Sequence, residues 1–185
     1  FTFSLWAKTI RNSVAQVVFY KASTITGWRG QFRIPAGSDR NSLFYITDGT
    51  NHDIYRYYNP YGNNLNTSDG KWHYFVGTCD RSQSKPPDVY LDGKILNGSP
   101  GAGYCNQLEE DIGTGVIYMG RGSSGSSEFF QGIIDDIKIY NAALPTSRIK
   151  QNYFLGLNNL YKNRGIAKNE YIERIAELKT NLIQD

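Results

Sequence analysis

The stretch KWHYFVGTCD, residues 71–80, is typical of one long β-strand, because aromatic and β-branched residues are enriched in strands. The proline pair Pro86-Pro87 then breaks the chain, and DVYL at 88–91 is a second strand. It runs into Asp92-Gly93, a hairpin turn signal since glycine tolerates a positive φ, and residues 94–96 return. This segment therefore predicts antiparallel β-structure.

Working outward, the same alternation recurs on both sides of that segment. Phe1, Phe3, Leu5 and Ala7 share one face of an opening strand. No leader precedes this strand, so we expect a trimmed or a mature fragment from which targeting information is missing. Further strand-like runs lie at 17–20, 31–34, 43–47, 53–58, 116–120 and 132–140, separated by Gly- and Asn-rich turns. The fold class predicted is all-β, a two-sheet antiparallel jelly-roll sandwich over residues 1–144.

The pattern changes after Leu144-Pro145. Apolar residues then recur at helical spacing, first as Ile149, Tyr153, Leu157 and Leu160, and after Gly165 as Tyr171, Ile172, Ile175, Leu178 and Leu182. Residues 145–185 therefore predict a C-terminal helical hairpin. Because two helices of this size are too small to be stable alone, we expect them to pack on the sandwich.

Composition narrows the class of protein. The 185 residues carry a formal net charge of +3 with scattered basic residues, so no nucleic-acid surface is indicated, and no apolar run is long enough for membrane insertion. The two cysteines, Cys79 and Cys105, lack metal-site spacing. They form either one disulfide or two separate buried thiols, and the sequence leaves both open.

Four segments in order resemble laminin-G-like domains of the concanavalin A-like lectin/glucanase superfamily. They are FTFSLWAK at 1–8, KWHYFVGT at 71–78, VYLDGK at 89–94 and FQGIIDDIKIYNAAL at 130–144. The resemblance implies an extracellular or cell-surface module for binding or adhesion, whose partner is a glycan or glycoprotein. It departs from the family in lacking the usual opening strand before Phe1.

The tail segment LYKNRGIAKNEY, residues 160–171, resembles the short helical module called SHOCT. That family usually has Thr or Ser where Ala167 stands, and Ala167 cannot cap the second helix, whereas Glu170 keeps the other half of a capping box. Laminin-G-like domains with such tails resemble those attached to pilin-type surface proteins. The tail could then contact other subunits of a surface assembly.

An acidic pair interrupts the last predicted strand. By alternation, Asp135 shares a face with Ile133, Ile137 and Ile139, and a carboxylate on an apolar face needs a partner. The laminin-G resemblance implies that Asp135 or Asp136 helps to hold a Ca²⁺ ion. The alternative, that Asp135 accepts backbone N–H groups or lies at the edge of the sandwich, stays open.

Ligand contacts are expected in loops rich in aromatic and amide side chains. Aromatic rings pack on the C–H faces of sugars, and amide side chains form hydrogen bonds with the sugar hydroxyls. The leading set is Tyr58, Tyr61, Asn63 and Asn64, followed by Trp28.

Catalysis is not expected. Some relatives of the fold hydrolyse glucans with closely spaced carboxylates, but the Glu-x-Asp-x-x-Glu pattern is absent and no catalytic residue is assigned. A carbohydrate-binding module is therefore the first hypothesis. The second is a structural assembly subunit or spacer without a sugar ligand, and the third is a glycoside hydrolase.

Overall fold

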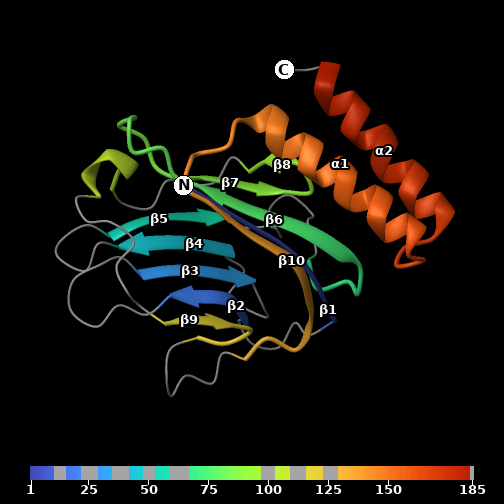
Figure 1. Ribbon diagram of the computed structural model, residues 1–185, viewed down its shortest axis with the longest axis horizontal. Helices are drawn as coiled ribbons and strands as arrows, with labels where there is room; N and C mark the ends of the chain where they lie inside the picture. The colour runs from blue at the N-terminus through green and yellow to red at the C-terminus, as the bar shows by residue number, and fades with distance from the viewer. Residues whose placement is uncertain are drawn as a thin grey trace.

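The computed structural model describes residues 1–10, 16–21, 29–34, 42–47, 53–58, 67–96, 103–108, 116–122 and 129–183. Within these residues, two five-stranded sheets face each other (Figure 1). The first contains, in spatial order, β10 (Gly132–Tyr140), β1 (Thr2–Thr9), β6 (Trp72–Thr78), β7 (Asp88–Leu91) and β8 (Lys94–Ile95). The second contains β5 (Asp53–Tyr58), β4 (Ser42–Thr47), β3 (Arg29–Ile34), β2 (Gln16–Lys21) and β9 (Ile117–Met119). The predicted antiparallel jelly-roll sandwich is confirmed.

A first core fills the space between the two sheets. Phe3, Leu5 and Ala7 of β1 point into it, as their alternation predicts. They meet aromatic rings of the facing sheet, of which Phe19 lies 4.1 Å from Phe3 between ring centroids. The disulfide between Cys79 and Cys105 also lies in this core, with 5.6 Å between its Cα atoms, and resolves the alternative left open by the sequence.

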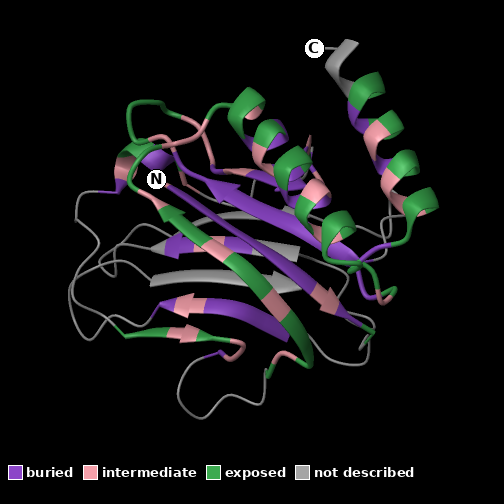
Figure 2. Cartoon of the chain, turned by 45° about the vertical axis from the view of Figure 1, so that its right-hand side comes forward, coloured by how far each residue is buried: buried purple, intermediate pink, exposed green. Residues whose placement is uncertain are grey.

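A second core lies on the outer face of the first sheet, under the helices α1 (Thr146–Lys162) and α2 (Lys168–Ile183) (Figure 1). Its buried residues are Trp6, Trp72, Tyr74, Val76, Tyr90, Ile149, Tyr153, Leu157, Ile166 and Leu178. The exposed sides of both helices face away from the sheet (Figure 2). The prediction that the tail packs on the sandwich is confirmed, although Ile172 is exposed rather than part of the apolar face.

The contact between α1 and the sheet is closest at Trp6. Its indole stacks on Tyr153 of α1, with ring centroids 5.6 Å apart, and lies 5.2 Å from Tyr74 of β6. Gly156, one turn after Tyr153, leaves room for the indole, because a Cβ there would lie 2.5 Å from Trp6 Nε1. A glycine inside a helix costs about 1 kcal/mol of stability relative to alanine. Gly156 therefore lowers the stability of α1 itself but allows its backbone to lie close to the indole.

Charged groups hold α2 against the same sheet. His73 of β6, only 8% exposed, has Nδ1 2.7 Å from Asp92 Oδ2 and Nε2 3.1 Å from Asp69 Oδ1. Arg174 of α2 donates to the Trp72 carbonyl at 2.7 Å and pairs with Glu170 at 3.0 Å. Burial opposes the charge on His73, but the Asp92 carboxylate and the hydrogen bonds to both carboxylates outweigh it and raise the pKa of His73 to about 9.

This raised pKa predicts a pH dependence of stability. The stabilisation by protonated His73 is complete below its usual pKa of 6.5 and is lost as the pH rises through about 9. We expect the free energy of unfolding, measured by urea titration, to fall between pH 6.5 and 9.5 in the parent chain. His73→Gln should remove that fall, whereas Lys85→Gln, which breaks a partly buried pair with Asp88 away from His73, should leave it in place. An unchanged slope in His73→Gln would show that other groups cause it.

The Gly156 contact predicts that a side chain at this position separates α1 from the sheet. Gly156→Val should lower the free energy of unfolding by about 1–3 kcal/mol, the usual cost of overpacking, even though most residues favour helix over glycine. Leu155→Ala, at an exposed neighbouring position, is the matched control and should change little. A stability gain in Gly156→Val would contradict the close approach.

Candidate functional site

A β-bulge in β10 places two carboxylates on the outer side of the sheet. Ser4 pairs with Lys138 and Trp6 pairs with Asp135, so β10 carries one more residue than β1 over this stretch. Asp136, within this stretch, takes a left-handed φ of +49°. Its backbone N–H donates to Asp135 Oδ1 at 2.8 Å, which stabilises the turn locally.

The bulge corrects the expected face of Asp135. Ile134 and Ile137, three positions apart, both pack against the first core, while Ile133 is 57% exposed. Asp135 is exposed beside Trp6, rather than buried on an apolar face with Ile133 and Ile137. The reason is the extra residue, which interrupts the alternation on which the expectation rested. Of the two roles considered, Asp135 does accept a backbone N–H, that of Asp136.

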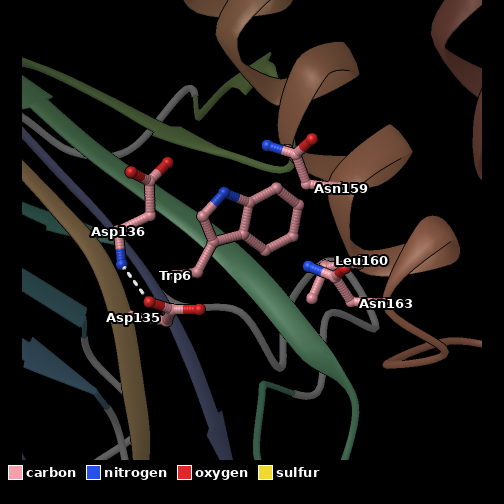
Figure 3. A pocket seen from close by; sticks show the side chains of 7 residues that line it. Trp6, Asp135, Asp136, Asn159, Leu160 and Asn163 are labelled. Carbon is pink, nitrogen blue, oxygen red and sulfur yellow. Dashed lines mark hydrogen bonds between the residues drawn. The ribbon is translucent and has the colours of Figure 1, made fainter.

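A cavity of about 250 Å³ opens between this bulge and the C-terminal half of α1 (Figure 3). Its lining residues are Trp6, Asp135, Asp136, Gly156, Asn159, Leu160 and Asn163. The two carboxylates lie on one side of the Trp6 indole, and the side chains from the end of α1 lie on the other (Figure 3). We refer to these seven residues as the bulge–helix pocket.

The pocket presents hydrogen-bonding groups of both kinds. Trp6 is 2% exposed, and its Nε1–H has no hydrogen-bond partner within the described chain. The Lys138 ammonium donates a hydrogen bond to Asp136 Oδ2, with 2.6 Å between the two atoms. The amides of Asn159 and Asn163 are exposed and can donate or accept. The polar groups within reach of a small ligand are therefore the two carboxylates and the two amides.

Most of the predicted ligand loop lies outside the described residues. Trp28, Tyr61, Asn63 and Asn64 lie outside the described residues, so their arrangement stays a prediction. Tyr58 is the last residue of β5, in the other sheet from Trp6 and Asp135.

Sequence reasoning missed the α1 residues of the pocket. Gly156, Asn159 and Asn163 are spaced by three and four, which places them on one helix face. That spacing was available as a signal, but their position over Trp6 depends on how α1 docks.

The comparisons with known proteins agree with this architecture. The family profile Laminin_G_3, described as the concanavalin A-like lectin/glucanases superfamily, matches residues 1–150. No protein of curated function matches the sequence significantly. The similarity to a SHOCT tail stays a prediction.

Solved structures show the same fold at low identity. The binding domain of Paraclostridial Mosquitocidal Protein 1 has 19% identity and a TM-score of 0.59, over 85% of this chain and 37% of that one. A heptameric pentraxin from Limulus polyphemus has 15% identity and a TM-score of 0.57, over 80% and 66%. Domain 4 of an extracellular arabinanase from Geobacillus stearothermophilus, in complex with arabinotriose, has 18% identity and a TM-score of 0.55, over 80% and 63%. The chain thus spans about a third of the toxin domain and just under two thirds of the other two.

Proposed function

The chain belongs to the concanavalin A-like lectin/glucanases superfamily, and we propose that it is a carbohydrate-binding module of a larger extracellular or surface protein. The observation that carries the proposal is the bulge–helix pocket, where two carboxylates and two amides line about 250 Å³ beside the Trp6 indole. Sugars are recognised by such sets of convergent polar groups. An arabinanase domain of the same fold, solved with arabinotriose, supports this choice of ligand class.

The proposed location follows from the disulfide and the family. A disulfide between Cys79 and Cys105 is favoured in oxidising compartments, and disulfides are rare in the cytosol. None of the described helices is long and apolar enough to cross a bilayer. A secreted or surface-displayed protein, including one of the pilus-like kind, is consistent with these observations.

We propose binding without catalysis. Glycoside hydrolysis needs two carboxyl groups that flank the scissile bond, about 5–9.5 Å apart. Asp135 and Asp136 are consecutive and lie on the same side of the indole (Figure 3). Asp136 is also paired with Lys138. Such a pair contacts a sugar from one side, which suits recognition better than bond cleavage.

An assembly subunit remains the alternative, and one observation favours it. A second cavity of about 330 Å³ lies between the two helices, with the apolar side chains of Phe154, Ile175 and Leu178 in its lining. A groove of this kind is typical of surfaces that bind other proteins. Binding to glycans distinguishes the two hypotheses, because an assembly subunit would bind none.

A glycan array followed by calorimetry tests the proposal. We expect single-site affinities of about 0.1–1 mM, with avidity supplied by multiple copies. The double change Asn159→Ala with Asn163→Ala should weaken the affinity about tenfold or more, since each lost hydrogen bond costs about 0.5–1.5 kcal/mol. Asn169→Ala removes an exposed amide of α2 outside the pocket and is the matched control.

The same assay separates the pocket from the loop. If Tyr58→Ala with Tyr61→Ala abolishes binding while the Asn159 and Asn163 changes do not, the sugar site is the loop predicted from sequence. If no glycan binds, the carbohydrate-binding proposal is wrong and the assembly-subunit hypothesis is favoured.

Binding of Ca²⁺ to Asp135 or Asp136 in the bulge–helix pocket stays a prediction. Asp135 and Asp136 offer carboxylate oxygens, and Asn159 and Asn163 offer amide oxygens, which is the ligand class that Ca²⁺ prefers. Lys138 competes for Asp136, and among the described residues no three His, Cys, Asp or Glu side chains form a metal-binding group.

If Ca²⁺ binds here, 1 mM Ca²⁺ should raise the melting temperature relative to EDTA, and Asp135→Asn should remove the difference. Glu173→Gln, an exposed carboxylate on α2, is the charge-matched control. Identical melting temperatures in Ca²⁺ and EDTA would leave Asp135 with the backbone role only.

A further inference from the structure

The cavity between the two helices combines apolar walls with basic side chains. It has a volume of about 330 Å³, and its lining residues are Ser147, Lys150, Gln151 and Phe154 of α1 and Ile175, Leu178 and Lys179 of α2. These residues of α1 belong to its N-terminal half, whereas the bulge–helix pocket is lined by residues from the C-terminal half. The two surfaces are therefore separate, and we refer to these seven residues as the interhelix groove.

Apolar side chains in the interhelix groove are open to solvent. Phe154 is 40% exposed, and Ile175, across the groove on α2, is half-buried. Ile172, one turn before Ile175, is 55% exposed and continues the apolar stripe along α2. Exposed apolar patches of this kind mark interaction surfaces, and aromatic residues near their centre contribute most to binding. Phe154 is therefore the expected anchor for a partner.

The cations beside the groove are placed against the helix dipole. α1 carries Arg148 and Lys150 among its first five residues and has no acidic residue in its first turn. Because a helix N-terminus bears partial positive charge, basic side chains there are unfavourable. Arg148 donates to Gln151 Oε1 at 2.7 Å, which places its guanidinium next to a lining residue, and Lys179 is exposed in the lining itself. None of the described lining residues is acidic, so the potential at the groove is positive.

These charges decide which occupant fits the groove. A twofold dimer formed through this surface would place the groove against its own copy and bring like charges together. A neutral apolar partner would cover Phe154 but leave the cations without a counter-charge. An acidic partner offsets both the basic side chains and the positive end of the α1 dipole.

The spacing of the lining residues indicates the shape of the partner. Those of α1 follow the i, i+3, i+4 and i+7 spacing of one helix face, and those of α2 follow i, i+3 and i+4. Two such rows of side chains border a groove in which a third helix can pack its own ridge of apolar residues. Binding of an amphipathic helix in a groove is a recurrent mode of protein recognition.

We propose that the interhelix groove binds an acidic amphipathic α-helix of a partner protein, whose apolar residues cover Phe154 while its carboxylates pair with Arg148 and Lys179. This inference goes beyond carbohydrate binding and does not depend on it, because the two surfaces lie on different halves of α1. A glycan and a partner helix would then bind to the same chain at the same time.

An acidic amphipathic peptide serves as the probe for this inference. A fluorescent peptide of about 15 residues, with Leu at helical spacing and Glu at the polar positions, is titrated with the full chain at neutral pH and low salt, and its anisotropy is measured. We expect it to bind about tenfold more tightly than the same peptide with Lys in place of Glu, because only the acidic peptide complements the cations. Added salt should reduce this difference.

A pair of neighbouring residues locates the apolar contact. Phe154→Ser should weaken binding of the acidic peptide about tenfold or more, because it removes the aromatic anchor. Leu155→Ser is the matched control, since Leu155 is similarly exposed, at 51%, but does not line the groove, and it should leave the affinity within about twofold.

Reversing the charges tests the electrostatic part. Arg148→Glu with Lys179→Glu should make the chain prefer the basic peptide over the acidic one. This double variant is expected to fold, because an acidic residue in the first turn of α1 suits the helix dipole, and its melting temperature checks this. Lys162→Glu with Lys168→Glu makes the same change in net charge at the other end of the hairpin and should leave the preference unchanged.

Several outcomes would overturn the inference. Equal affinity for the acidic and basic peptides contradicts the charge assignment, and binding that survives Phe154→Ser places the peptide elsewhere. A dimer in sedimentation velocity that Phe154→Ser dissociates identifies a second copy as the occupant. Binding of decanoate that Phe154→Ser removes, without binding of the peptide, identifies a small anionic amphiphile instead. The glycan array is read independently of all four, so the carbohydrate-binding proposal and this one fail separately.

Discussion

The indole of Trp6 is the contact on which the helical part of the molecule depends. It stacks on Tyr153 and fits under Gly156, so the backbone of α1 approaches the sheet more closely than it could over any side chain. The outer face of the first sheet carries Trp72, Tyr74 and other apolar residues, which would form a large exposed patch without the helices. The same close approach brings the end of α1 beside β10 and encloses the pocket.

The bulge in β10 has a local cost and a spatial consequence. Asp136 adopts a backbone conformation that non-glycine residues avoid, and the hydrogen bond to Asp135 offsets part of that cost. Two consecutive side chains then point outward, where regular alternation would turn one of them into the core. Strain of this kind often marks functional sites, and here it lies in the wall of the pocket.

The charged groups around His73 lie beside the Trp6 contact, because His73 pairs with Ala7 in the register that pairs Tyr74 with Trp6. The two ring nitrogens of His73 are hydrogen-bonded to Asp92 and Asp69. Neither nitrogen is therefore free for acid–base chemistry, and the ring connects the two carboxylates. Arg174 joins α2 to the backbone of Trp72, next to His73. Apolar packing on Trp6 thus holds α1, and the hydrogen bond from Arg174 to the Trp72 carbonyl holds α2.

The amino-acid sequence alone determined the sandwich, the hairpin of helices and the inward face of β1, because those features follow from local periodicity and turn residues such as Asp92-Gly93. The pairing of Cys79 with Cys105 and the direction of Asp135 depended on tertiary structure, since distance between cysteines and a one-residue bulge leave no periodic signal. The pocket was likewise beyond local patterns. Trp6 and Asn163 are far apart in sequence, and only the docking of α1 on the sheet brings them together, because that docking is set by the shapes of facing side chains rather than by the order of residues.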